Sequence, residues 1–117
     1  MTGDHDEPVV TETTPDGITV VRLQGAVDDD SAPALTRTLI DAAAHGSSRT
    51  VIDLSGLSFA DSSVLHALLG ARKAHAAAGK KLVLAGPLHL AISRLFEVTN
   101  TGPAFQWADS LQAGMTC

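Results

Sequence analysis

A chain of 117 residues is long enough for one hydrophobic core and too short for two cores and a linker, so we expect a single domain. Its hydrophobic content of 44% excludes wholesale disorder, and 13 acidic against 8 basic residues, a net charge of -5, argue against nucleic acid or anionic lipid as a partner. The single cysteine, Cys117, leaves no internal disulfide, and no apolar run approaches the roughly 20 residues of a membrane span, which predicts a cytoplasmic protein without direct membrane contact.

The beginning of the chain reads as a polar leader followed by a hairpin. Residues 1–8 are mostly polar, which predicts a disordered leader and a folded domain over residues 9–117. Residues 9–14 are short and rich in β-branched side chains, as in an edge strand. Residues 15–17, Pro-Asp-Gly, favour a turn, and residues 18–23 resume the strand pattern.

The next segment contains the first helix and a buried strand. Three carboxylates at positions 28–30 follow Gly25, and Ser31 precedes apolar residues at helical spacing. Asp30 or Ser31 is placed to cap this helix, and Gly46 is placed to close it. Residues 50–54 are nearly all apolar, which is typical of a central strand that is covered on both faces.

A loop and a second helix follow this strand. Residues 55–60 are expected to form the loop, and the helix extends from Ser62 to Gly79. Gly70 lies inside it at a cost of about 1 kcal/mol relative to alanine, which suggests that a neighbouring backbone approaches closely there. Residues 81–85 form the next strand.

The last third of the chain predicts one more amphipathic helix, a short closing strand and a final helical turn or two. The helix is marked by apolar residues between positions 92 and 99, the strand by residues 105–107 and the last turns by residues 108–113. Strands that alternate with helices imply parallel strands joined by right-handed crossovers. We therefore expect an α/β fold with a mixed sheet of four to five strands and helices packed on one face.

The sequence offers little support for an enzyme. Its five histidines are scattered over the leader, helix ends and helix surfaces, so no metal site is expected. Ser62 and His66, with Asp61 or Asp53, suggest a hydrolase triad, but the chain lacks the Gly-x-Ser-x-Gly turn and a glycine-built oxyanion hole. No phosphate-cradling glycine loop occurs. We expect neither catalysis nor a cofactor bound by this chain.

One segment carries a recognisable motif. The strand ends in Asp53-Leu54-Ser55, an aromatic residue follows at Phe59, and Asp61-Ser62-Ser63 opens the second helix. This pattern resembles the STAS domain family and, within it, the bacterial anti-sigma factor antagonists. The likeness extends over most of the chain, through segments 25–28, 81–85, 92–96 and 105–113.

The resemblance implies a regulatory function. Ser62 corresponds to the serine that a partner kinase, itself an anti-sigma factor, phosphorylates with ATP and Mg²⁺ held in the kinase. The unmodified antagonist captures the anti-sigma factor and frees the sigma factor, the phosphorylated form lets go, and a serine phosphatase restores the first state. The residues expected to contact the partner surround Ser62: Asp28, Asp61, Ser63, Val64 and Leu65.

Alternatives remain open at this stage. Without the resemblance, a serine at the start of a helix is most simply an N-cap. Val64 stands where the family usually has glycine, so it is either a specificity element that rejects other kinases or the mark of a domain that is no longer phosphorylated. The rival function is a STAS subunit of a lipid-transport or transporter complex, docked on an ATPase without serine modification.

Overall fold

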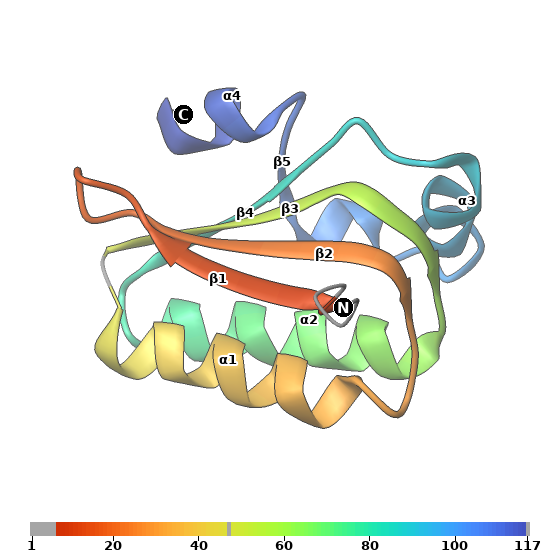
Figure 1. Ribbon diagram of the computed structural model, residues 1–117, viewed down its shortest axis with the longest axis horizontal. Helices are drawn as coiled ribbons and strands as arrows, with labels where there is room; N and C mark the ends of the chain where they lie inside the picture. Colours follow the sequence, from red (N-terminus) through yellow and green to blue (C-terminus); the bar gives the residue numbers. More distant parts are fainter. Residues whose placement is uncertain (1–6, 47, 117) are drawn as a thin grey trace, which may run out of the picture.

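A five-stranded mixed sheet forms the centre of the computed structural model, which describes residues 7–46 and 48–116 (Figure 1). Residues 1–6 of the predicted leader lie outside the described residues, as does Cys117. The strands follow the order β1-β2-β3-β4-β5, with β1 antiparallel to β2 and all later neighbours parallel. Their bounds are Val9–Thr13 for β1, Thr19–Val27 for β2, Arg49–Ala60 for β3, Lys81–Ala85 for β4 and Gln106–Ala108 for β5.

The two long helices cover one face of the sheet. Helix α1 (Ala32–His45) and helix α2 (Ser62–Ala77) lie side by side below the strands in Figure 1. Their apolar side chains pack against alternate residues of the central strand, because successive residues of a strand point to opposite faces. This core includes Leu35 and Leu39 of α1, Leu65 and Leu68 of α2, and Ile52 and Leu54 of β3.

Three shorter elements complete the chain. Helix α3 (Leu90–Val98) lies beside the distal end of β3, and a 3₁₀ turn (Gly102–Ala104) leads from it toward β5 (Figure 1). Helix α4 (Leu111–Thr116) lies on the face of the sheet opposite α1 and α2. None of the helices in the described ranges is both long enough and apolar enough to cross a membrane.

The mixed α/β sheet is confirmed, but the prediction that helices pack on one face holds only for the long ones. Helix α4 covers Val51 and Val83, whose side chains point away from the main core and are fully buried. The sequence suggested only a turn or two of helix here because six residues are too few to show a helical period. A strand buried on both faces, as the residues 50–54 predicted, needs this second cover.

Gly114 is the residue that lets α4 approach the sheet. A Cβ at this position would lie 2.8 Å from Val51 Cγ1, too close for two carbon atoms. Gly70, by contrast, has nothing within 4 Å of such a Cβ, so the close approach predicted from the sequence at Gly70 is wrong. The position where only glycine fits against a neighbouring element therefore lies in α4 and not in α2.

These two glycines make a matched pair for a stability measurement. We expect Gly114→Ala to lower the free energy of unfolding by about 1–3 kcal/mol, because the added methyl group overpacks a buried contact. We expect Gly70→Ala to raise it by up to about 1 kcal/mol, because alanine is the better helix former. Urea unfolding of both variants tests this, and equal effects would refute the assignment of the close contact to Gly114.

Strand β3 is longer than predicted. Residues 55–60, expected as a loop, continue the strand and pair with Gln24 to Val27 of β2. The pairing passes two register shifts, one between Arg22 and Gln24 and one between Gly25 and Ala26. Such irregularities break the alternation of apolar and polar side chains, which is why the sequence pattern ended too early.

His75, one of the histidines expected at helix ends and helix surfaces, is instead buried between α2 and β3, with 1% of its surface exposed. Its Nδ1 donates to the Ala71 carbonyl at 2.8 Å, because a carbonyl only accepts, and its Nε2 therefore accepts from the Thr50 hydroxyl at 2.8 Å. Burial lowers the pKa of His75 below its usual value of 6.5, and nearby Lys80 lowers it further. The neutral imidazole is the form that fits.

This burial predicts an acid-sensitive fold. Because the folded state binds the His75 proton less tightly than the unfolded state, the stability that it contributes is complete above pH 6.5 and declines as the pH falls below 6.5 toward the folded-state pKa. Urea unfolding between pH 8 and about pH 5 measures the effect. His75→Gln is expected to flatten the profile, and an unchanged pH dependence in that variant would assign the effect to another group.

Candidate functional site

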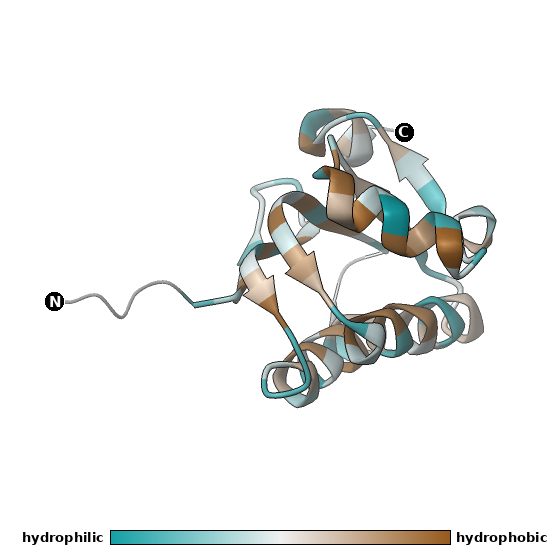
Figure 2. Cartoon of the chain, turned by 90° about the vertical axis from the view of Figure 1, so that its right-hand side faces the viewer, coloured by the Kyte–Doolittle hydropathy of each residue, from teal (hydrophilic) through white to brown (hydrophobic). Residues whose placement is uncertain are grey.

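Two loops meet at the carboxyl ends of β2 and β3. Ala26 pairs with Phe59 and Val27 with Ala60 in the parallel ladder, so the loop that begins at Asp28 lies beside Asp61. Figure 2 looks onto this end of the molecule, where strand ends and helix starts face the viewer. In open α/β sheets the carboxyl ends of parallel strands are where binding sites form, because helix N-termini and loops gather there.

Asp61 opens helix α2. It adopts an extended backbone conformation, φ -108° and ψ -173°, and its carboxylate accepts a hydrogen bond from the Ser63 amide at 3.0 Å. The Ser63 hydroxyl donates to the same carboxylate oxygen. Asp61 is therefore the N-cap, and the simplest reading of Ser62, that of a capping serine, does not hold.

Ser62 is left as the first residue of the helix with its side chain in solvent. The residue is exposed, and within the described part of the chain no hydrogen-bond partner of its hydroxyl is found. The neighbouring residues at the helix start form hydrogen bonds with Asp61 and not with Ser62. The Ser63 hydroxyl donates to the Asp61 carboxylate, and the Val64 amide donates to the Asp61 carbonyl at 3.2 Å. The hydroxyl of Ser62 is thus free to meet another molecule.

The hydrogen bonds at the cap hold Asp61 in its charged form. The Ser63 hydroxyl is the largest cause of a lowered pKa, burial partly opposes it, and the backbone amides of Ser63, Val64 and Asp29 lower the pKa further. The contribution of Asp29 connects the two loops across the sheet end. A charged carboxylate at a helix N-terminus also suits the positive end of the helix dipole.

A substitution pair tests the role of Asp61 as a cap. We expect Asp61→Ala to lower the urea midpoint and Asp61→Asn to retain most of it, because asparagine caps helices about as well as aspartate. Since the folded-state pKa lies below 3.8, the stability due to the charged form is present above pH 3.8 and is lost as the pH falls through the folded-state pKa. Equal midpoints for the alanine variant and the unmodified protein would remove Asp61 from the cap.

The second loop is acidic and internally bonded. The half-buried Asp28 accepts a hydrogen bond from the Asp30 amide at 3.1 Å through its side chain, and its carbonyl accepts from the amides of Ser31 and Ala32 at 3.1 and 3.0 Å. Asp28, Asp29 and Asp30 bring one carboxylate oxygen each within 4.8 Å of one another. Ser31 occupies the cap position of α1 without a side-chain hydrogen bond, so Asp28 organises this helix start.

Two residues predicted to contact a partner lie in the core. Val64 is 1% exposed and Leu65 is 5% exposed, and both belong to the cluster between the helices and the sheet. A partner that docks on the surface cannot touch these side chains. The motif placed them correctly at the start of the helix but could not show which way the first turn faces, so Asp28, Asp61 and Ser63 remain as candidate contacts.

The carboxylates of the suggested hydrolase triad serve other partners. Asp61 is bonded to Ser63, and Asp53 accepts from the amide and the hydroxyl of Ser55 at 3.0 and 2.8 Å. Asp53 therefore organises the backbone within β3. Neither carboxylate has a hydrogen bond to His66 in the residues that the structure describes. The geometry therefore gives no support to a hydrolase triad.

Comparison with known proteins agrees with this architecture. A family model described as "Mlab, STAS domain" matches residues 10–102. No curated protein matches the sequence. An anti-sigma factor antagonist from Mycobacterium paratuberculosis is 25% identical, with a TM-score of 0.80 over 92% of this chain and 90% of that one.

Two further solved structures show the shared fold at lower identity. The anti-sigma factor antagonist SpoIIAA in its unphosphorylated form is 21% identical, with a TM-score of 0.71 over 89% of this chain and 90% of that one. The Bacillus cell fate determinant SpoIIAA in its phosphorylated form is 22% identical, with a TM-score of 0.70 over 90% and 95% of the two chains.

Proposed function

This chain belongs to the STAS domain family, and we propose that it acts there as an anti-sigma factor antagonist. In this proposal the unmodified protein binds a serine-kinase anti-sigma factor and so releases a sigma factor. Phosphorylation of Ser62 ends the binding, and a serine phosphatase restores it. The protein itself is a regulator and not an enzyme.

The exposed Ser62 hydroxyl is the observation that carries the proposal. It stands at the first position of α2, it is not used for capping, and the acidic loop Asp28–Asp30 lies beside the same sheet end. A kinase active site needs a hydroxyl that it can surround. The solved antagonists, one in an unphosphorylated and one in a phosphorylated form, share this fold and give the proposal its family context.

The proposed modification is a phosphoryl transfer. The Ser62 oxygen forms a bond to the γ-phosphorus of ATP, the bond from that phosphorus to the β-phosphate oxygen breaks, and ADP leaves. The hydroxyl proton passes to a base in the kinase, where ATP and Mg²⁺ are also held. Dephosphorylation adds water at the phosphorus, which restores the hydroxyl and releases inorganic phosphate.

The experiment that tests this function is a competition for the anti-sigma factor. Serine-kinase anti-sigma factors from the same organism, each preloaded with its sigma factor, are mixed with the purified protein and separated by size. We expect one of them to release its sigma factor and to co-elute with the unmodified protein. Retention of every sigma factor in its complex would contradict the proposal.

A second candidate function rests on one observation, that the matching family model carries the description Mlab and does not name an antagonist. In this alternative the chain is a STAS subunit of a lipid-transport or transporter complex that docks on an ATPase and is not phosphorylated. Co-elution with such an ATPase, without any mass gain at Ser62, would favour it. The lipid-transport function is the weaker candidate, because it gives no role to the Ser62 hydroxyl, which is exposed and does not cap α2.

A further inference from the structure

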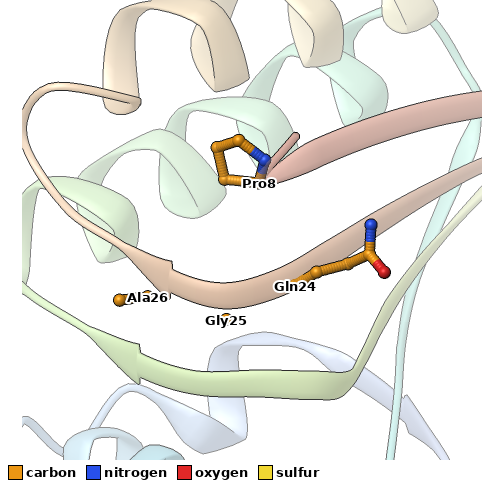
Figure 3. A pocket seen from close by; sticks show the side chains of 4 residues that line it. All are labelled: Pro8, Gln24, Gly25 and Ala26. Carbon is orange, nitrogen blue, oxygen red and sulfur yellow. The ribbon is translucent and has the colours of Figure 1, made fainter. Parts of the chain in front are cut away.

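Strand β1 stops short of the end of β2 and leaves a hollow beside it. The β1–β2 ladder ends at Val9 and Leu23, and one more hydrogen bond joins the Gln24 amide to the Pro8 carbonyl at 3.0 Å. Beyond it, Gly25 and Ala26 of β2 are exposed. The hollow has a volume of about 350 Å³ and is lined by Pro8, Gln24, Gly25 and Ala26 (Figure 3).

An exposed aromatic residue, Phe59, is the strand partner of Ala26, which lines this hollow. Phe59 is paired with Ala26 across the β2–β3 ladder, and paired residues of neighbouring strands point to the same face of the sheet. The residue is 51% exposed although its ring is large and apolar. Aromatic side chains in such positions often anchor protein interfaces, because they bury much area with few rotatable bonds.

The two chain segments that meet at this apolar spot carry only acidic charges. Residues 24–31 and 56–65 contain Asp28, Asp29, Asp30 and Asp61 but no lysine or arginine. Carboxylates that flank an apolar patch attract a partner with positive charges and repel one with negative charges. The exposed apolar patch and the neighbouring carboxylates together favour a partner segment that has both apolar and basic side chains.

We propose that Phe59 and the hollow at Ala26 take a bulky apolar side chain from a partner segment whose lysine or arginine residues face the Asp28–Asp30 loop. The inference rests on the proposed function in placing the partner at this end of the sheet. It extends the contact surface from Asp61 and Ser62 along β3 to the part of β2 that lies beyond the end of β1. It also gives the acidic loop a role in recognition.

Selection from a library of short random peptides displayed on phage tests this chemistry without any kinase. We expect the selected peptides to combine basic residues with leucine, methionine or an aromatic residue. Their affinity should fall by about tenfold or more for Phe59→Ser and for Ala26→Leu, which fills the hollow, and should weaken with added salt. Amide spectra confirm that both variants fold.

Val98→Ser provides the matched control, because Val98 is 77% exposed at the end of α3 and is not among the residues that line the hollow. Unchanged affinity for this variant is expected. Selected peptides that are acidic, that bind Phe59→Ser as tightly as the unmodified protein, or that fail to enrich at all would overturn the inference. Because the selection contains no anti-sigma factor, such a failure is separate from a failure of the sigma-factor competition described above.

Discussion

Phosphorylation of Ser62 is expected to weaken binding to the anti-sigma factor by a factor on the order of 10⁴, since a change from mostly bound to mostly free requires roughly 5.5 kcal/mol. The added group carries about -1.5 to -2 charges at neutral pH. Its attraction to the free amides at the start of α2 supplies only about 0.3–1 kcal/mol at an exposed site, so helix capping cannot be the switch.

The larger contribution must come from the interface. A phosphate on Ser62 would stand near the carboxylates of Asp61 and the Asp28–Asp30 loop, and no lysine or arginine of the two loops is available to pair it. Docking would strip water from this doubly charged group, and the basic residues proposed for the partner do not compensate it because they are already paired with the Asp28–Asp30 carboxylates. Calorimetric titration of both forms against the anti-sigma factor measures the effect, and Ser62→Ala taken through the same kinase treatment is the control that cannot be modified at this position.

The phosphorylated protein is expected to change only near Ser62. Amide chemical shifts should move in residues 28–31 and 61–66 and stay constant through the sheet, because the switch is local charge and not refolding. Asp28→Asn should recover part of the lost affinity of the phosphorylated form. Shift changes spread through β2 to β4, or no recovery in the asparagine variant, would contradict a local electrostatic switch.

Val64→Gly, which restores the residue usual in the family, is expected to lower the free energy of unfolding by roughly 2–4 kcal/mol. The Val64 side chain is 1% exposed and packs in the core, so its removal leaves a cavity. Glycine within the first turn of α2 adds a backbone cost of about 1 kcal/mol. Urea unfolding measures the sum, and Val64→Ala separates the cavity from the backbone effect.

The same variant tests whether the Val64 side chain selects the kinase. A buried side chain cannot select a kinase by direct contact, so Val64→Gly should be phosphorylated by the same kinase as the unmodified protein under conditions where it is folded. A glycine variant with unchanged stability but a new choice of kinase would instead make Val64 a specificity element at the surface.

Much of the fold followed from local patterns. The hairpin at residues 15–17 was predicted from turn chemistry, and helix α1 from apolar spacing and Gly46, because these signals are contained within a few residues. The length of β3 and the position of α4 were not predictable. The first depends on bulges that the partner strand imposes, and the second on a contact between Gly114 and Val51 across more than sixty positions.

The candidate site was likewise predictable only in part from the sequence. The motif placed Ser62 and Asp61 at the start of a helix, but only the geometry shows that Asp61 is the cap and that Ser62 is free. The orientation of Val64 into the core depends on the entry angle of α2, which no local pattern fixes. The hollow at Ala26 arises where β1 ends against β2. It could not be predicted from the sequence, because it depends on how these two strands pair.

The most direct test of the central claim is the intact mass of the protein after incubation with each candidate serine-kinase anti-sigma factor, ATP and Mg²⁺. The unmodified protein and Ser63→Ala should each gain the mass of one phosphoryl group, and Ser62→Ala should gain none. A Ser62→Ala protein that still gains that mass would show that the exposed hydroxyl at the start of α2 is not the acceptor.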